Sequence, residues 1–236
     1  MKAVILAGGL GTRLQPYTFF IPKPMLPIGN KPLLEHLIEW LKANSIKEMI
    51  FCVSYLHRTI EDYFEEGNRF GVKVKYARTD RPLATAGQLK TASKFLENNS
   101  PFVCIYGDSI YDFNLKKMIR EHKKYNAFLS MALSSYTTRL KYGFIDTDGK
   151  EDFVTNWREK PEIQGLINVG CYVIEKEFLD LIPSSSAFGM DDAVKLALKQ
   201  NRTIKGFKIN GGFTDIGDKK SYLETHNHYV KKLGNI

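Results

Sequence analysis

The residue types best suited to chemistry lie close together near the amino terminus, in residues 6–27. Gly8, Gly9 and Gly11 stand in this stretch, and glycine lets backbone N–H groups converge on a ligand because it has no Cβ. A concave row of such amides suits an anion. Arg13 follows the glycines and offers a planar fork of donors that matches phosphate oxygens. The stretch therefore predicts a phosphate-binding loop.

Lys23 adds a second cation to this loop, and it lies between Pro22 and Pro24. The prolines restrict the backbone around Lys23 and so favour a fixed position for its ammonium group. The loop is neither of the two common glycine-rich nucleotide motifs. A dinucleotide-binding fingerprint needs a third glycine where Leu14 stands, and a P-loop needs a glycine where Pro22 precedes the lysine. The alternative for the glycines alone is a plain turn after a strand.

Two carboxylates stand in similar settings further along the chain. Asp108 follows the apolar segment 102–106 and a glycine, and Asp215 lies in the glycine-rich segment 211–217. A carboxylate at the end of a strand is a suitable magnesium ligand. The alternative for Asp108 is an aspartate that forms a turn or caps a helix.

Apolar and amphipathic segments alternate over the first half of the chain. Strands are expected at residues 3–6, 49–53, 72–76 and 102–106, and helices at residues 32–41, 59–64, 86–96 and 115–125. This alternation predicts an α/β fold with a doubly wound, mostly parallel sheet and helices on both faces. Because ligands bind such sheets at the carboxyl ends of the strands, the loop and Asp108 are expected on the same edge.

The second half is less regular. Strands are expected at residues 128–134, 142–146, 153–157, 166–174 and 204–209, and helices at residues 190–198 and 219–231. No linker, repeat or low-complexity segment divides the chain, so we expect a single domain over residues 1–236.

Composition limits the classes of partner. The formal net charge is +8, but the lysines are spread along helices and no nucleic-acid-binding motif is present, so nucleic acid is not expected as a partner. The chain has neither a signal peptide nor an apolar run of about 20 residues, so we expect a cytoplasmic protein without a membrane partner. The three cysteines lie in apolar segments without a C-x-x-C pair, which argues against a disulfide framework or a zinc site.

A longer pattern runs through the amino-terminal loop, G-x-G-T-R-x-x-P-x-T-x-x-x-P-K-P. Its positions are held by Gly9, Gly11, Thr12, Arg13, Pro16, Thr18, Pro22, Lys23 and Pro24. In these nine positions the chain resembles the sugar-phosphate nucleotidylyltransferases, in the short form without a β-helix domain. The resemblance implies a Rossmann-like nucleotidyltransferase fold with a smaller, β-rich sugar-binding part. It also implies a nucleoside triphosphate and a sugar 1-phosphate as substrates, Mg²⁺ as cofactor, and a possible homo-oligomer.

The resemblance divides the single domain and assigns its residues. Residues 1–125 form the nucleotide-binding half, residues 126–218 the sugar-phosphate-binding half and residues 219–236 a C-terminal helix. Arg13, Lys23 and Lys160 are the expected catalytic residues, with Lys160 holding the attacking sugar phosphate. The expected nucleotide-binding residues are Leu6, Ala7, Gly8, Gly9, Gly11, Thr12, Arg81 and Gly87. The expected sugar-binding residues are Tyr142, Gly143, Glu159, Asn168 and Gly170, and the expected metal ligands are Asp108 and Asp215.

Several of these assignments have alternatives. The tripeptide at residues 159–161 is, on its own, more often a solvated charged turn, and Asn168 could instead bond to a neighbouring loop. Ala84 and Gln88 depart from the usual base-binding loop, which leaves guanine, uracil, thymine and cytosine all open. An inactive relative that binds nucleotide sugars is the alternative to an enzyme. It is disfavoured because the expected catalytic and metal-binding residues are all present: Arg13, Lys23, Asp108, Lys160 and Asp215.

Overall fold

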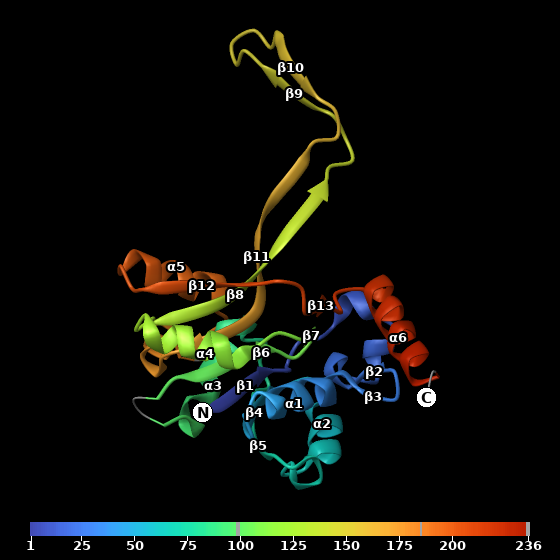
Figure 1. Cartoon of the computed structure of the whole chain (residues 1–236), viewed down its shortest axis with the longest axis vertical. Helices are drawn as coiled ribbons and strands as arrows, with labels where there is room; N and C mark the ends of the chain where they lie inside the picture. The colour runs from blue at the N-terminus through green and yellow to red at the C-terminus, as the bar shows by residue number, and fades with distance from the viewer. Residues whose placement is uncertain (98–99, 185, 235–236) are drawn as a thin grey trace.

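A seven-stranded sheet forms the centre of the protein, seen in a computed structural model that describes residues 1–97, 100–184 and 186–234 (Figure 1). The strand order is β12-β8-β11-β6-β1-β4-β5. β11 is antiparallel to both neighbours and every other neighbouring pair is parallel, so the predicted mostly parallel, mixed sheet is confirmed. The strands are β1 (Lys2–Leu6), β4 (Glu48–Val53), β5 (Lys73–Arg78), β6 (Phe102–Tyr106), β8 (Leu129–Arg139), β11 (Glu162–Ile174) and β12 (Ile204–Ile209).

Helices cover both faces of this sheet, and β1 shows why. Successive strand residues point to opposite faces. Ala3 and Ile5 pack in one core with helices α1, α2 and α4, whereas Val4 and Leu6 pack in a second core with α3 and α5. A strand buried on both faces has to be apolar, as β1 is from Ala3 to Leu6. The helices are α1 (Leu33–Ala43), α2 (His57–Phe64), α3 (Ala84–Thr91), α4 (Leu115–Lys124), α5 (Met190–Lys199) and α6 (Lys219–Leu233).

Three two-stranded sheets lie outside the main sheet. They are β2 (Pro27–Ile28) with β3 (Lys31–Pro32), β7 (Ser109–Tyr111) with β13 (Phe213–Asp215), and β9 (Phe144–Thr147) with β10 (Val154–Arg158). α6 packs beside the first of these in a third core that includes Leu26, Ile28 and Tyr222. β7 and β13 were not expected from the sequence. Residues 235–236, the end of the predicted C-terminal helix segment, lie outside the described residues.

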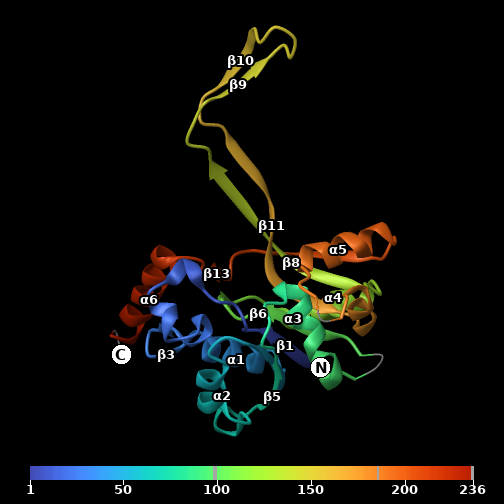
Figure 2. The ribbon, with the colours of Figure 1, turned by 180° about the vertical axis from the view of Figure 1, so that it is seen from behind.

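Two strands are longer than the sequence predicts. β8 continues to Arg139 instead of ending at residue 134, and β11 begins at Glu162 instead of residue 166. The two strands pair with each other along these extensions, from the pair Glu162–Arg139 inward. Together with the β9–β10 hairpin at their end, they form a ribbon that projects away from the rest of the molecule, and we call residues 134–168 the arm (Figures 1 and 2).

The carboxyl ends of β1 and β6 lie side by side, because the two strands are parallel neighbours with Leu6 opposite Tyr106. The backbone N–H of Gly107 donates to the carbonyl of Leu6 at 2.9 Å, which holds the segments after the two strands together. The glycine loop and Asp108 therefore meet at one edge of the sheet. None of the helices in the described part of the chain combines the length and apolar character needed to cross a bilayer.

Candidate active site

A cleft with a volume of about 220 Å³ opens at this edge of the sheet. Its walls come from the amino-terminal loop, from the start of α3 and from the turn after β6. It is lined by Leu6, Ala7, Gly9, Gly11, Thr12, Arg13, Leu14, Lys23, Pro24, Thr85, Gln88, Tyr106, Gly107, Asp108 and Gly217. The loop residues predicted to bind phosphate and Asp108 thus share one cavity.

The loop is held in its curved shape by its own residues. Gly11 has a left-handed φ of 64°, and a Cβ there would lie 2.9 Å from the Cγ2 of Thr18. The hydroxyl of Thr18 donates to the carbonyl of Gly11 at 2.9 Å, which closes the loop on itself. Gly8 is fixed from two sides, because its N–H donates to Gln88 Oε1 at 3.2 Å and its carbonyl accepts from Ser54 Oγ at 2.7 Å. The cradle is therefore shaped before any anion binds.

Lys23 is the buried cation of the cleft. Its side chain is 8% exposed, and its Nζ lies 2.7 Å from Asp108 Oδ2. A buried ammonium needs such a partner, because its desolvation would otherwise be costly. Lys23 begins a short 3₁₀ turn, Lys23–Met25, in which Pro24 follows it directly.

Asp215 joins Asp108 through the pairing of β13 with β7. Asp215 stands opposite Ser109 in this ladder, and the N–H of Ile216 donates to the carbonyl of Asp108 at 3.2 Å. Arg13 completes the group on the other side. A Cβ added to Gly217 would lie 2.5 Å from Asp215 Oδ2 and 3.5 Å from Arg13 Nη1, so Gly217 leaves the space that lets these two side chains approach.

The electrostatics of Asp215 reflect this grouping. Burial raises the pKa of its carboxyl, and the negative charge of Asp108 raises the pKa further, while Lys23 and Arg13 oppose the shift. Asp108 lines the cleft and Asp215 lies close enough for the two charges to repel each other, so a divalent cation near both would relieve this repulsion. No cluster of three or more His, Cys, Asp or Glu that could hold a metal occurs within residues 1–97, 100–184 and 186–234. A pair of carboxylates fits Mg²⁺, which keeps several waters and binds substrate phosphates.

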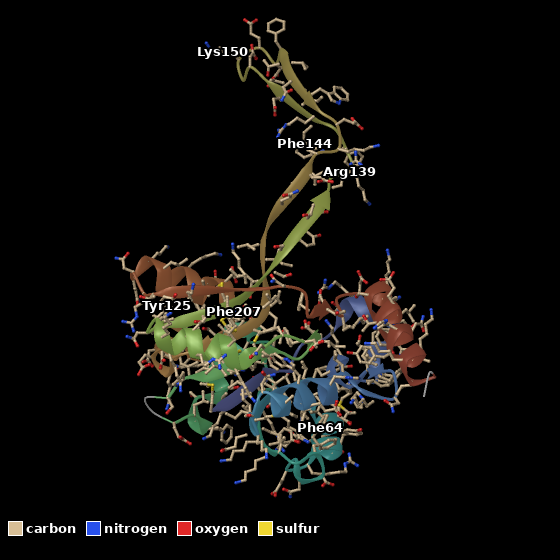
Figure 3. The ribbon with its side chains drawn as sticks, in the orientation of Figure 1. Phe64, Tyr125, Arg139, Phe144, Lys150 and Phe207 are labelled. Atoms are coloured by element: carbon tan, nitrogen blue, oxygen red, sulfur yellow. The ribbon has the colours of Figure 1, made fainter. Side chains whose placement is uncertain are left out.

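Four of the predicted sugar-binding and catalytic residues lie elsewhere. Tyr142, Gly143, Glu159 and Lys160 belong to the arm, and none of them lines the cleft. The carbonyl of Lys160 accepts from Arg139 Nε at 3.2 Å, and Figure 3 shows Arg139 far out on the ribbon. The expectation that Lys160 shares a cleft with Arg13 and Lys23 is therefore not met within one chain. The reason is that β8 and β11 continue past the edge of the sheet before the chain turns.

These arm residues are nevertheless grouped with one another. Glu159 Oε2 accepts from Trp157 Nε1 at 3.1 Å, and a Cβ at Gly143 would lie 2.9 Å from the same Glu159 oxygen. Lys160 has a positive φ of 43°, and its Nζ lies 3.7 Å from Glu159 Oε1. Gly143, Glu159 and Lys160 are thus close to one another on the arm, separate from the cleft.

Asn168 and Gly170 lie at the base of the arm, where the pairing of β8 and β11 changes register. The amide of Asn168 is engaged by its own strand: its Oδ1 accepts from Gly170 N at 3.0 Å, and its Nδ2 donates to the hydroxyl of Tyr172. Gly170 has a φ of 72°, and a Cβ there would lie 2.5 Å from Tyr106 Cδ2. Because Tyr106 lines the cleft, Gly170 borders it. The bonds of Asn168 are structural, but they are made within β11 and not to a neighbouring loop, the alternative that the sequence left open.

The two predicted base-binding residues, Gly87 and Arg81, do not line the cleft either. Gly87 is the fourth residue of α3, and a Cβ there would lie 2.8 Å from the carbonyl oxygen of Ser186. Its lack of a side chain therefore serves the packing of the helix against residues 186–188. Arg81 lies in a turn, where its N–H donates to Thr79 Oγ1 at 3.2 Å, and it does not line the cleft.

Sequence reasoning missed three polar residues that do line the cleft, Thr85, Gln88 and Tyr106. Gln88 had a signal, because it stands one residue after Gly87 in the segment that resembles the base-binding loop. Tyr106 also had one, because it ends a strand whose carboxyl edge was expected to bind the ligand. The Thr85 side chain is held in place because its Oγ1 accepts a hydrogen bond from the N–H of Met190 at 2.8 Å.

A family model described as nucleotidyl transferase matches residues 2–232. The chain belongs to the nucleotidyl transferase family. This nucleotidyl transferase is 34% identical over 223 residues to the D-glycero-alpha-D-manno-heptose 1-phosphate guanylyltransferase of Campylobacter jejuni, with 94% of this chain and 97% of the relative covered. It is 32% identical over 240 residues to the mannose-1-phosphate guanylyltransferase catalytic subunit beta of Xenopus tropicalis, with 99% of this chain but 66% of the relative covered.

A solved structure extends the likeness to three dimensions. HddC from Yersinia pseudotuberculosis, in complex with GMP-PN, is 31% identical and superposes with a TM-score of 0.76 over 97% of this chain and 99% of that one. The two sequence relatives are sugar-1-phosphate guanylyltransferases, and the family match and the superposition confirm the expected family and fold.

Proposed function

We propose that this nucleotidyl transferase moves a guanylyl group from GTP to a 1-phosphate of a manno-configured sugar. Two named relatives are guanylyltransferases, for a manno-heptose 1-phosphate and for mannose 1-phosphate, and the solved relative was crystallised with a guanine nucleotide analogue. Guanine is common to all three, and a manno-configured sugar is common to the two guanylyltransferases. The sequence itself left the base and the sugar open.

The reaction is a single displacement at phosphorus. An oxygen of the sugar 1-phosphate attacks the α-phosphorus of GTP, and the bond from that phosphorus to the oxygen bridging to the β-phosphate breaks. Pyrophosphate leaves with the electron pair of that bond, and the product is a GDP-sugar. The attacking phosphate is already ionised, so no general base is required. The protein has to supply alignment and neutralisation of charge.

The observation that carries this proposal is the convergence of Arg13, Lys23 and Asp108 in one cleft, with Asp215 beside them on β13. Arg13 and Lys23 lie on the amino-terminal loop, whose glycine cradle suits a triphosphate. Their positive charges would stabilise the departing pyrophosphate. Mg²⁺ held by Asp108 and Asp215 would neutralise further negative charge on the phosphates when bound. Lys23, buried against Asp108, would turn toward a phosphate oxygen without leaving the cleft.

We expect Gln88, which lines the cleft, to contact the base. Its Oε1 accepts from Gly8 N–H at 3.2 Å, which orients the amide so that its nitrogen can donate into the cleft. Guanine offers carbonyl and ring-nitrogen acceptors to such a donor. Replacement of Gln88 should therefore affect the KM for the nucleotide more than the KM for the sugar phosphate.

The test is a matrix of four nucleoside triphosphates against the 1-phosphates of mannose, manno-heptose, glucose and an amino sugar, with pyrophosphate release as the readout. We expect the highest kcat/KM with GTP and a manno-configured sugar. Activity confined to UTP, dTTP or CTP would refute the base, and activity confined to glucose or amino-sugar phosphates would refute the sugar. Binding of a GDP-sugar without any pyrophosphate release would favour the inactive nucleotide-sugar-binding relative instead.

A further inference from the structure

The arm has no core of its own. Every residue from Leu133 to Asn168 is described, and none of them is buried. A two-stranded ribbon without a covered hydrophobic face is marginally stable in water. The arm is nevertheless rich in large apolar side chains that are exposed: Tyr136, Tyr142, Phe144, Ile145, Phe153, Val154, Trp157, Ile163 and Leu166. Exposed apolar surface of this extent marks a contact surface.

The apolar side chains are not spread evenly around the ribbon. In the β9–β10 hairpin Ile145 stands opposite Trp157, so both project from one face, and they are 42% and 66% exposed. The other face carries Asp146, whose Oδ1 accepts from Arg158 Nη2 at 2.8 Å and whose Oδ2 accepts from Asn156 Nδ2 at 3.0 Å. One face of the hairpin thus combines the exposed Phe144 with an internally paired polar group, and the opposite face presents Ile145 and Trp157 uncovered.

The amino-terminal loop also carries an uncovered apolar patch on the body of the molecule. The segment between Arg13 and Lys23 exposes Tyr17, Phe19, Phe20 and Ile21, with Phe20 83% exposed. Tyr55 adds to this patch, and its hydroxyl donates to the carbonyl of Phe19 at 2.9 Å. We call these five side chains the loop patch. It lies next to the cations of the cleft because it is part of the same loop.

The arm and the body of the molecule also differ in net charge. Residues 134–168 hold five Lys or Arg and six Asp or Glu, a net charge of −1, so the rest of the chain carries +9 of the total of +8. The tip, residues 146–152, holds four acidic residues and one lysine. An acidic tip is attracted to a basic body. The acidic tip does not contact the basic body of its own chain, because the arm projects away from that body (Figure 3).

The arm also keeps its phosphate ligand away from its own cleft. The strand residues 134–139 alone extend about 20 Å at the usual rise of a strand, and Lys160 is bonded to the far end of that stretch. The Lys160 and Glu159 side chains are 52% and 57% exposed and face solvent. One chain therefore has a cleft without the arm residues and an arm without a cleft.

We propose that two copies of this chain exchange arms, so that the arm of one copy lies on the loop patch of the other and brings Lys160 and Glu159 to its cleft. The apolar face with Ile145 and Trp157 covers the patch, and a two-fold axis makes the exchange mutual. The sugar 1-phosphate is then held by Lys160 of the second copy. The role of Lys160 in this arrangement rests on the proposed function. The contact between the arm and the loop patch does not depend on it.

The decisive experiment combines two defective chains. Arg13→Ala damages the cleft and Lys160→Ala damages the arm, so each variant alone should have little activity at low sugar 1-phosphate concentration. Co-expressed, half of the dimers are mixed, and in each of these one cleft and one arm are intact. We expect recovery to about one quarter of the wild-type activity, as random pairing in a two-fold dimer dictates. No recovery, with an active wild type, would show that each arm serves its own cleft and would overturn the proposal.

A second measurement needs no activity. Sedimentation velocity of the full chain should show a dimer, and Ile145→Glu should shift it toward the monomer. Phe144→Glu is the matched control, because Phe144 is the adjacent residue, is 45% exposed and projects from the opposite face of the hairpin. A monomeric wild type, or equal effects of the two substitutions, would refute the arm exchange. If the wild type is dimeric but inactive with every substrate pair, the proposed function fails while the arm exchange stands.

Discussion

Arg13 is the residue on which the chemistry of the cleft depends most directly. Arg13→Ala should lower kcat/KM by roughly 10²–10³-fold, because it removes a donor aimed at charge that develops in the transition state. Arg13→Lys keeps the positive charge and loses the planar fork, so it should restore only part of the activity. Steady-state kinetics of pyrophosphate release measure both. Near-normal turnover of the alanine variant would remove Arg13 from the mechanism.

Asp215 combines a functional position with a cost in stability. Burial and the charge of Asp108 raise the pKa of its carboxyl in the folded protein. Ionisation of Asp215 therefore costs more in the folded protein than in the unfolded chain. The free energy of unfolding is highest while Asp215 is protonated and falls as the pH rises through its pKa in the folded protein. Asp215→Asn should unfold at a higher temperature than the wild type at about pH 7.5 in a chelating buffer, and the difference should vanish near the ordinary aspartate pKa of about 4.

Asp218 gives the matched control for this measurement. It caps α6, and hydrogen bonds from the backbone and the hydroxyl of Ser221 lower the pKa of its carboxyl. Its ionised form stabilises the fold, so Asp218→Asn should not raise the unfolding temperature at neutral pH. An Asp215→Asn variant that is no more stable than the wild type at neutral pH would show that the two acids do not repel each other in the folded protein.

The residues of the cleft could be predicted where they are neighbours in sequence. Arg13, Lys23 and the glycines belong to one loop, so their types and spacing already predict a common task. Asp215 was assigned by its local sequence, but its approach to Asp108 depends on the pairing of β13 with β7, which no pattern indicated. Gln88 was noticed as a departure from a motif, and only the fold shows that its amide reaches back to Gly8.

At the scale of the elements, β11 has two tasks, since one half lies in the core and the other half forms the arm. Gly170 stands at the transition, with a left-handed φ and with Tyr106 at a distance that leaves no room for a Cβ. Gly170→Ala should lower the free energy of unfolding by roughly 2–5 kcal/mol, the combined cost of left-handed backbone and overpacking. Gly165→Ala on the same strand is the control, because a Cβ there has no neighbour within 4 Å.

Denaturant unfolding of both glycine variants measures this difference. Gly165→Ala should stay within about 1 kcal/mol of the wild type, since it meets neither cost. Equal stabilities of the two variants would mean that the strand relaxes at Gly170 and that Tyr106 moves, and the nucleotide KM would then report a shift of the cleft wall.

The strands of the sheet were predictable and the arm was not, for a physical reason. β1, β4 and β6 are continuous apolar runs because both faces are covered, and such runs are visible in the sequence. Residues 134–139 read Ser-Ser-Tyr-Thr-Thr-Arg, which has no core-facing alternation, so the sequence predicts an end to the strand there. The strand continues because Thr137 and Thr138 pair with Gln164 and Ile163 on β11, a long-range partnership that local pattern does not encode.

At the scale of the whole molecule, the distribution of charge can be tested through the arm tip. If the acidic tip lies on the basic body of a second copy, Glu151→Lys should weaken dimerisation and Lys150→Glu should strengthen it, because the two neighbouring substitutions reverse charge in opposite directions. Both changes in Kd should shrink as salt rises from about 0.05 M to about 0.5 M, where the Debye length falls to a few ångströms. Sedimentation at two salt concentrations measures them. Shifts of the same sign for both variants would mean that the tip meets something other than a basic surface, and the apolar face of the hairpin would then have to hold the two copies together alone.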